Sequence, residues 1–519
     1  MWLPLILLVY LTTAHSFLIP RLSRLRGKTL AETNTNRDIK TFYYKQVLDH
    51  FNYLPQSYRT FQQRYFINFK YWGGANSTAP IFVCFGGEAA IDSVPDTIGF
   101  MTENAEKFKA LLVYIEHRYY GKSIPFKSKA KILKNIGYFS SAQALADYAQ
   151  VLIYIKKTLQ AENSPVIVIG GSYSGMLAAW FRMKYSHLAI GALASSAPIL
   201  FMDDLIQPNA YYDVVSRNFK EASASCYNTI HSSWDEIDKI ASQPNGLMIL
   251  SERFNTCQTL NHSVELSDYL KSMYTEAAQF NIPPEYPVNK ICNAIDQASF
   301  GNDILDKIYS GLVSFFGNQT CKDANPTYSS EIDMGWGWQR CSEMVIPDGT
   351  GNDTMFWPSP FNLNNFVKKC KKDYGVPPRP HWISSYYGGQ NIKLVLRRVL
   401  TNLSKSLVAI TTVNGSHCLD LMPSQQTDPK WLIEQRKKEV KIIKRWIKQY
   451  YNDLLSFRLY LKLLVPLAAE LQNCLFHVLR FSSSPSAGTE SVAGLQKQPV
   501  TTRICFCCAC LVLDEADCE

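Results

Sequence analysis

Between about residue 60 and residue 200, short apolar runs alternate with longer amphipathic stretches. Residues 141–158 carry Ala, Leu and Tyr side chains three and four positions apart, which places them on one side of a helix. Four apolar runs have the length of buried strands, at 81–85, 110–115, 166–169 and 192–196. Buried strands that alternate with amphipathic helices predict a parallel sheet covered by helices.

This alternation stops at about residue 202 and returns after residue 375. The intervening segment is predicted to be a mostly helical insertion. An apolar run at 407–412 then predicts another strand, and the next residues predict a helix at 429–451. Beyond residue 455 the chain is irregular, then Ser-rich and Cys-rich, which predicts disorder. The predicted plan is a signal peptide at 1–16, an α/β domain at 40–201 and 376–452, the insertion at 202–375 and a disordered tail at 453–519.

The amino-terminal sequence predicts export. Residues 2–11 form an apolar run that is too short to span a bilayer, and Ala14-His15-Ser16 follows as a small-x-small cleavage site. Six Asn-x-Ser/Thr acceptor sites fit a secreted chain: Asn76, Asn261, Asn318, Asn352, Asn402 and Asn414. We therefore expect passage through the secretory pathway without stable membrane insertion.

Cysteine usage agrees with an oxidising compartment. Of the 14 cysteines, six lie in the predicted insertion: Cys226, Cys257, Cys292, Cys321, Cys341 and Cys370. An even set in one segment fits three disulfides. None of the six forms a C-x₂-C pair, so a zinc site is disfavoured, and we expect neither a metal nor a cofactor. The net charge is +9, and the basic residues are scattered along the chain except for a cluster at 436–445. This cluster is typical of a solvated helix face and does not indicate a nucleic-acid site.

The strongest chemical signal is a serine at a tight turn between a strand and a helix. Gly170-Gly171 follows the apolar run at 166–169, Ser172 comes next, and a helical pattern begins. In a nucleophile elbow this turn projects the serine hydroxyl, and the next amide, that of Tyr173, faces the oxyanion. The strict G-x-S-x-G motif would have glycine at position 174, where this chain has Ser174. An incidental serine in a glycine-rich turn is the alternative.

A second oxyanion amide and the general base have candidates, but the catalytic acid does not. Gly86-Gly87 follows a predicted strand, where the second amide usually lies. His417 lies in a loop after the last predicted strand, the usual place of the base. Between residues 374 and 416 there is no Asp or Glu. Asp373 and Asp420 flank this gap, and neither has the expected spacing from the histidine.

Three motifs together resemble the family of serine peptidases that contains lysosomal Pro-Xaa carboxypeptidase and dipeptidyl peptidase II. They are the elbow at 170–180, Glu-His-Arg-Tyr-Tyr-Gly-Lys-Ser at 116–123 and His-Cys-Leu-Asp-Leu at 417–421. The resemblance runs from about 40 to 452. It implies an α/β-hydrolase fold with a helical, disulfide-bonded cap, and cleavage next to proline near peptide ends.

The resemblance also assigns roles to residues of this chain. It implies Ser172 as nucleophile and His417 as base, with the Tyr173 and Gly87 amides as oxyanion donors. It places Met176 in an apolar proline pocket and Glu88 where it can hold a substrate's ammonium group. It pairs the cysteines as Cys226 with Cys292, Cys257 with Cys321 and Cys341 with Cys370, and it suggests a homodimer in the lysosome, a vacuole or outside the cell.

Three departures separate this chain from the family pattern. Ser174 replaces a glycine and Cys418 replaces a second histidine. The family's Asn-Gly-x-x-Asp-Pro-Trp-Ser segment, which supplies a strand and the catalytic Asp, is absent before Thr401. The first hypothesis is a serine exopeptidase for proline-containing peptides, impaired by the missing acid. The second is an inactive secreted relative that acts as a binding protein, and an esterase on the same fold is disfavoured by the specific motifs.

Overall fold

The computed structural model of the chain describes residues 38–202, 206–298, 303–324, 331–388, 408–412 and 414–481. Of these, the side chains of 331–333, 458 and 460–481 are not described. The predicted signal peptide at 1–16 and the segment 389–407, where the missing strand would lie, fall outside the described residues. The chain divides into two compact units, Met1–Tyr451 and Asn452–Glu519.

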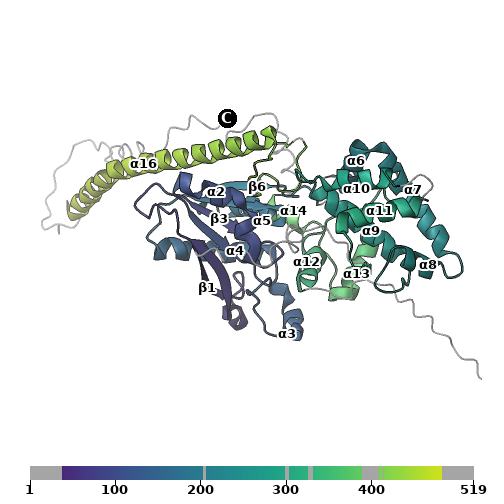
Figure 1. The fold of residues 1–519 in the computed structure, drawn as a ribbon. Helices are drawn as coiled ribbons and strands as arrows, with labels where there is room; N and C mark the ends of the chain where they lie inside the picture. The colour runs from purple at the N-terminus through teal and green to yellow at the C-terminus, as the bar shows by residue number, and fades with distance from the viewer. Residues whose placement is uncertain are drawn as a thin grey trace, which may run out of the picture. The chain divides into compact units, whose positions relative to one another are not determined.

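A six-stranded sheet forms the centre of the first unit, in the order β1-β2-β4-β3-β5-β6 (Figure 1). The strands are β1 Ile39–Val47, β2 Thr60–Asn68, β3 Ile81–Phe85, β4 Leu111–Ile115, β5 Val166–Gly171 and β6 Ala189–Ser195. Strands β3 to β6 pair in parallel, and they confirm the four runs expected from the sequence. Strands β1 and β2 add an antiparallel hairpin that the sequence did not predict.

The hairpin was missed because buried polar residues occupy both of its faces. Gln46, Gln63 and Arg64 are all buried, which hides the usual alternation of apolar and polar residues. The Gln46 amide donates to the Gln63 side chain at 3.0 Å, and Arg64 forms an ion pair with buried Glu116 at 2.6 Å. Only these long-range partners make the polar residues acceptable in a buried strand.

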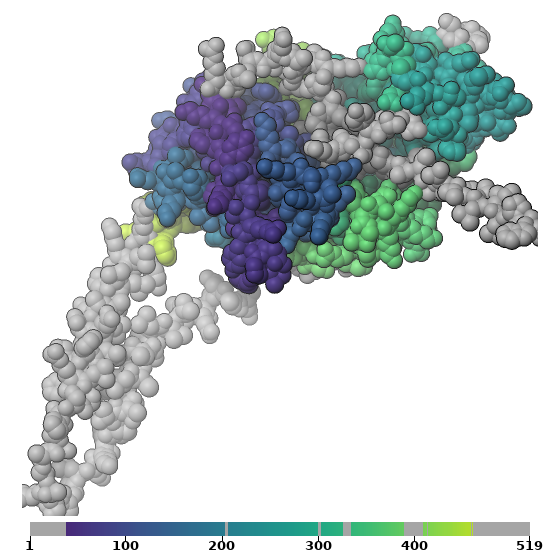
Figure 2. Space-filling model, turned by 90° about the horizontal axis from the view of Figure 1, so that it is seen from below, coloured from purple at the N-terminus to yellow at the C-terminus, as the bar shows by residue number. Residues whose placement is uncertain are grey.

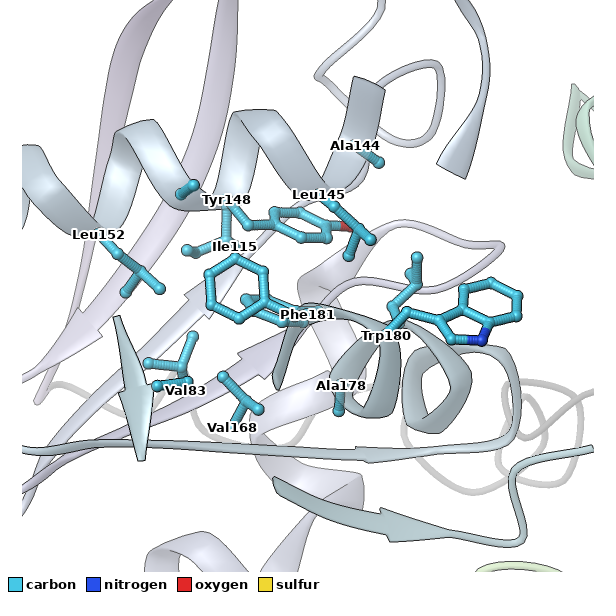
Figure 3. Packing of buried hydrophobic residues seen from close by; sticks show 14 of the residues in the cluster. Val83, Ile115, Ala144, Leu145, Tyr148, Leu152, Val168, Ala178, Trp180 and Phe181 are labelled. Atoms are coloured by element: carbon cyan, nitrogen blue, oxygen red, sulfur yellow. The ribbon is translucent and has the colours of Figure 1, made fainter. Parts of the chain in front are cut away.

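Helices cover both faces of the sheet. On one face α4 (Ser141–Thr158) and α5 (Ser172–Lys184) pack against alternate residues of the parallel strands, as Figure 3 shows for Val83, Ile115 and Val168. On the other face α2 (Gly99–Phe108) packs with the first part of α16 (Lys430–Phe481), which contributes Val440 and Ile443. Burial on both faces explains why the parallel strands are continuous apolar runs.

Two predictions about the carboxy-terminal part differ from the structure. Residues 408–412 are not a strand, because a strand needs a paired neighbour for its backbone groups and the described part of the sheet ends at β6. The helix expected at 429–451 continues in α16 to Phe481, through a leucine-rich stretch that also contains Pro466. Within the described residues, no helix is long and apolar enough to cross a membrane.

The insertion is helical, and its first part has a hydrophobic core of its own. Its helices are α6 (Ala210–Ala222), α7 (Ala224–Ala241), α8 (Gly246–Arg253), α9 (Ser263–Gln279), α10 (Pro287–Asp296), α11 (Ile304–Phe316), α12 (Glu331–Ser342) and α13 (Leu363–Tyr374). Three disulfides join Cys226 to Cys292, Cys257 to Cys321 and Cys341 to Cys370, the pairs that the resemblance implies. The described residues also contain the short helices α1 (Val94–Thr97), α3 (Lys129–Lys134) and α14 (Trp382–Tyr387). The architecture is an α/β-hydrolase fold with a helical, disulfide-bonded insertion.

Helix α12 packs on the hydrolase part of the chain, although the sequence placed it in the insertion. Trp336 belongs to the core beside the sheet, and the Trp338 indole N–H donates to the Phe139 carbonyl at 2.8 Å. In the space-filling view of Figure 2, the green residues that follow the teal helices lie against blue residues of the hydrolase part. Beyond α12, the carboxylate of buried Glu343 accepts hydrogen bonds from the Ser141 amide and hydroxyl, both at 2.8 Å.

Glu343 makes the stability of this contact depend on pH. Burial raises the pKa of Glu343 from 4.5 to about 7, although its hydrogen bonds with Ser141 oppose the shift. Between these values the folded chain holds a proton that the unfolded chain releases, so stability falls as pH rises from about 4.5 to about 7. With about 1.4 kcal/mol per pKa unit, the loss is on the order of 3 kcal/mol.

We therefore expect Glu343→Gln to remove this part of the pH dependence, because the neutral amide has nearly the same shape and never ionises. Denaturant unfolding at pH 5 and pH 7.5 measures the effect in both proteins, the two pH values being chosen at roughly either side of the titration. If the free energy of unfolding falls equally in the wild type and the variant between the two pH values, the prediction is contradicted.

Candidate active site

Ser172 is held in a strained conformation where β5 meets α5. Its φ of 58° lies in the left-handed region, which costs a residue with a side chain about 1–2 kcal/mol. The preceding strand is fully buried, whereas Ser172 itself is only partly buried. A sharp turn at the end of a rigid strand projects the hydroxyl away from the sheet. This is the geometry that a nucleophile elbow requires.

The glycines around Ser172 are needed for close approach. A Cβ on Gly170 would lie 2.4 Å from the Ser174 carbonyl oxygen, and one on Gly171 would lie 2.6 Å from the Cys418 sulfur. Both distances are shorter than van der Waals contact. Ser174, where the strict motif has glycine, is accommodated because its hydroxyl donates to the Phe85 carbonyl at 2.6 Å. The departure at position 174 therefore leaves the turn intact.

The same turn lies next to the predicted second oxyanion loop. A Cβ on Gly87 would lie 3.6 Å from the Ser174 amide nitrogen and 3.9 Å from the Tyr173 ring. Gly87 and Tyr173, which the sequence analysis named as oxyanion donors, are thus neighbours in space. Glu88 is partly buried in the same loop. Met176 is fully buried in the core on α5, and its place in a proline pocket stays a prediction.

The loop with His417 lies against the elbow. Cys418 follows the histidine, and its sulfur sits over Gly171. The Cys418 amide donates to the Ser196 hydroxyl at 2.9 Å, and burial raises the pKa of its thiol. The structure therefore brings the residue next to His417 to the residue next to Ser172. No hydrogen bond joins the side chains of Ser172 and His417, the predicted nucleophile and base, in the described part of the chain.

His417 is covered by the insertion. Its amide donates to the Gln279 carbonyl at 2.8 Å, and its ring contacts the Phe280 ring edge to face, with centroids 6.0 Å apart. The Nε2 atom is buried without a hydrogen-bond partner among the described residues. Burial lowers the pKa of His417 to about 4. The imidazole is therefore neutral, and able to accept a proton, even in acidic surroundings.

Removal of the Phe280 ring tests this account. Phe280→Ala admits water to His417, so we expect the pKa of the imidazole to rise from about 4 toward 6.5, its ordinary value. Since only the neutral form is a base, the acid limb of the rate of serine labelling by a fluorophosphonate should move to higher pH. Phe280→Leu keeps the apolar cover and should move it much less. Identical acid limbs in the wild type and Phe280→Ala would exclude burial by Phe280 as the cause.

Neither candidate acid contacts His417. The Asp420 carboxylate accepts a hydrogen bond from the Ser195 hydroxyl, and burial raises its pKa. The Asp373 carboxylate forms an ion pair with Lys369 at 2.6 Å on α13. Each therefore has a partner other than the imidazole. In the described ranges, moreover, no group of three or more His, Cys, Asp or Glu side chains is arranged to hold a metal ion.

The motif at 116–123 forms buried ion pairs that join the end of β4 to β2 and α4, a role that the sequence analysis did not assign. Buried Arg118 forms a two-pronged ion pair with Asp147 on α4, both contacts at 2.6 Å. Glu116 binds Arg64, and Gly121 is required because a Cβ there would lie 2.0 Å from the Glu116 carboxylate. The signal in the sequence was a run of charged and aromatic residues directly after a buried strand.

Comparison with known proteins agrees with these observations. Residues 46–439 match the family described as serine carboxypeptidase S28. The chain is 34% identical to the lysosomal Pro-X carboxypeptidase of Homo sapiens over 450 residues, covering 80% of this chain and 90% of that protein. It is 36% identical to the protein of that name from Bos taurus, with coverages of 79% and 89%. A thymus-specific serine protease of Mus musculus is 28% identical, with coverages of 79% and 88%.

Proposed function

The chain belongs to the serine carboxypeptidase S28 family and is a serine peptidase, and from this premise we propose that it removes the residue after a proline at the carboxyl end of a peptide. The observation that carries the proposal is the strained Ser172 at the junction of β5 and α5. The hydroxyl of Ser172 attacks the prolyl carbonyl and forms an acyl-enzyme, which water then hydrolyses. The names of the mammalian relatives support proline as the preferred residue.

The neighbouring groups take the remaining roles in this proposal. His417 accepts the proton of Ser172 and passes it to the leaving amine. The amides of Tyr173 and Gly87 stabilise the oxyanion. Met176 contributes to an apolar pocket for proline, and Glu88 meets a charged end of the substrate.

The low pKa of His417 suits an acidic compartment of the secretory pathway. At a pH near 5 an ordinary imidazole is mostly protonated, with a pKa of about 6.5, and cannot act as a base. A pKa of about 4 keeps His417 neutral there. Residence in the lysosome or a vacuole follows, as for the lysosomal relatives, and the extracellular space is the alternative prediction. A homodimer without a nucleic-acid partner remains the prediction for the assembly.

The second candidate function is that of a binding protein that retains the fold without strong catalysis. One observation favours it, namely that His417 has no carboxylate partner among the described residues. Without an acid the histidine tautomer is not fixed, and turnover falls by about 10⁴. In this reading the elbow and the insertion bind proline-containing peptides and release them uncleaved.

Two peptides distinguish the candidates. The first has a blocked amino-terminus and ends in Pro-Phe with a free carboxylate, and the second has a free Xaa-Pro amino-terminus and a blocked carboxyl end. We expect slow cleavage of the first at acidic pH, measured by mass spectrometry. Cleavage of the second alone would assign dipeptidyl peptidase specificity and a role for Glu88. Binding of both peptides without cleavage of either would favour the binding protein.

A further inference from the structure

The phenol of Tyr173 lies in a buried polar network that links the elbow to the insertion. His117 Nε2 is 3.0 Å from the Tyr173 hydroxyl, and the Gln339 amide nitrogen is 2.7 Å from it. The Tyr120 hydroxyl donates to the Gln339 carbonyl oxygen at 2.7 Å. All four side chains are at most 2% exposed. Such a network is rigid only if each member has a defined donor or acceptor role.

The contacts fix these roles. The Nδ1 atom of His117 is 2.6 Å from the Arg118 carbonyl oxygen, which can only accept, so Nδ1 carries the proton. Burial lowers the pKa of His117 to about 4, so the ring is neutral and Nε2 is an acceptor. The Tyr173 hydroxyl therefore donates to His117 and accepts from Gln339. Its position is determined from both sides.

Helix α12 supplies the part of this network that comes from the insertion. Trp336 packs against the Tyr173 ring with centroids 5.5 Å apart, one helical turn from Gln339. These two side chains hold the face and the hydroxyl of the tyrosine that follows the nucleophile. The backbone amide of Tyr173 can then turn only if the ring moves, and the ring is enclosed.

We propose that Gln339 is a positioning residue of the active site: by holding the phenol of Tyr173, it fixes the direction of the Tyr173 amide toward the oxyanion. The inference rests on the proposed function, in which that amide is an oxyanion donor. The proposal gives α12, a helix of the insertion, an indirect contribution to catalysis through the position of Tyr173.

The test uses Tyr173→Phe, Gln339→Met and the double variant. We expect each single change to slow fluorophosphonate labelling of Ser172 on the order of tenfold, the usual effect of losing one positioning hydrogen bond. The double variant should be slower by clearly less than the product of the two single effects, because both changes break the hydrogen bond between Gln339 and Tyr173. Tyr274→Phe is the matched control, since it removes a buried phenol oxygen that has no partner among the described residues.

A pH profile separates positioning from packing when Glu343, whose carboxyl also contacts Gln339, is replaced by Gln in both proteins compared. In Gln339→Glu a protonated carboxyl still donates to Tyr173 and accepts from Tyr120, whereas the ionised carboxylate cannot donate. Labelling of Gln339→Glu should therefore approach the wild-type rate at acidic pH and fall as pH rises, with thermal melting used to verify that the protein stays folded. A profile parallel to that of the wild type would overturn the proposal.

Hydrogen exchange supplies a readout that needs no catalysis. Gln339→Met should increase exchange in the peptide that covers 166–176, and Tyr274→Phe should not. Unchanged exchange in Gln339→Met would reject the positioning role whether or not Ser172 reacts. If exchange increases but wild-type Ser172 is never labelled, the structural link stands while the proposed function fails.

Discussion

Insertion of the family's strand and Asn-Gly-x-x-Asp-Pro-Trp-Ser loop before Thr401 is expected to raise cleavage of a prolyl peptide by about 10⁴ or more. The acid normally holds the histidine tautomer and stabilises the imidazolium. In the described part of the chain, the imidazole of His417 has no such partner. The measurement is kcat/KM at acidic pH for both proteins after expression through the secretory pathway.

The inserted strand should also repair the sheet. Strand β6 is the last in the described order, and residues 408–412 lack a strand conformation. A new strand beside β6 would offer paired backbone groups to 408–412. The control carries the same insertion with alanine in place of its Asp, so that it restores the strand without the acid. Robust turnover by the unmodified chain would show that Asp420 or Asp373 serves as the acid.

Replacement of Ser172 by alanine is expected to abolish fluorophosphonate labelling. Turnover should fall to about 10⁶ below that of a complete triad, which is about 10² below a chain that lacks only the acid. The covalent step needs the hydroxyl at the strained turn. Ser174, two residues away, already donates to the Phe85 carbonyl. Peptide mapping of the labelled protein locates the adduct.

The matched control is Ser174→Gly, which restores the strict motif at the elbow. Labelling should persist in this variant, because the Ser174 hydroxyl that it lacks anchors the turn and does not react. An adduct on Ser174, or labelling that survives Ser172→Ala, would reject Ser172 as the nucleophile. Both variants should have far-ultraviolet circular dichroism like that of the wild type.

The elements that the sequence predicted are those with local causes. The strand at 166–169, the turn at Gly170-Gly171 and the helix at 141–158 depend on apolar period and glycine placement within a few residues. Structure and sequence therefore agree on β5, α4 and the position of Ser172 at the turn. The even set of cysteines likewise predicted a disulfide-bonded insertion, although the pairing came from the family resemblance and not from spacing.

The strand predicted at 407–412 shows where local patterning failed. An apolar run is compatible with a strand, but pairing depends on a neighbour elsewhere in the chain. For the hairpin of β1 and β2 the local pattern missed an element that the structure contains. Its buried Gln46, Gln63 and Arg64 look unsuitable for a buried strand until their partners are known. Chain order also predicted His417 as base, but it could not reveal that Phe280 covers the ring.

The sequence by itself determined the fold class, the turn that carries Ser172 and the family to which these motifs belong. Only the tertiary structure decided the protonation of His117, the pairing of Tyr173 with Gln339 and the burial that lowers the pKa of His417. The physical reason is the distance along the chain over which each interaction acts. Periodicity and turn chemistry act over a few residues, whereas a buried polar group is stable only beside a partner that folding brings from far along the chain, as Gln339 is brought to Tyr173.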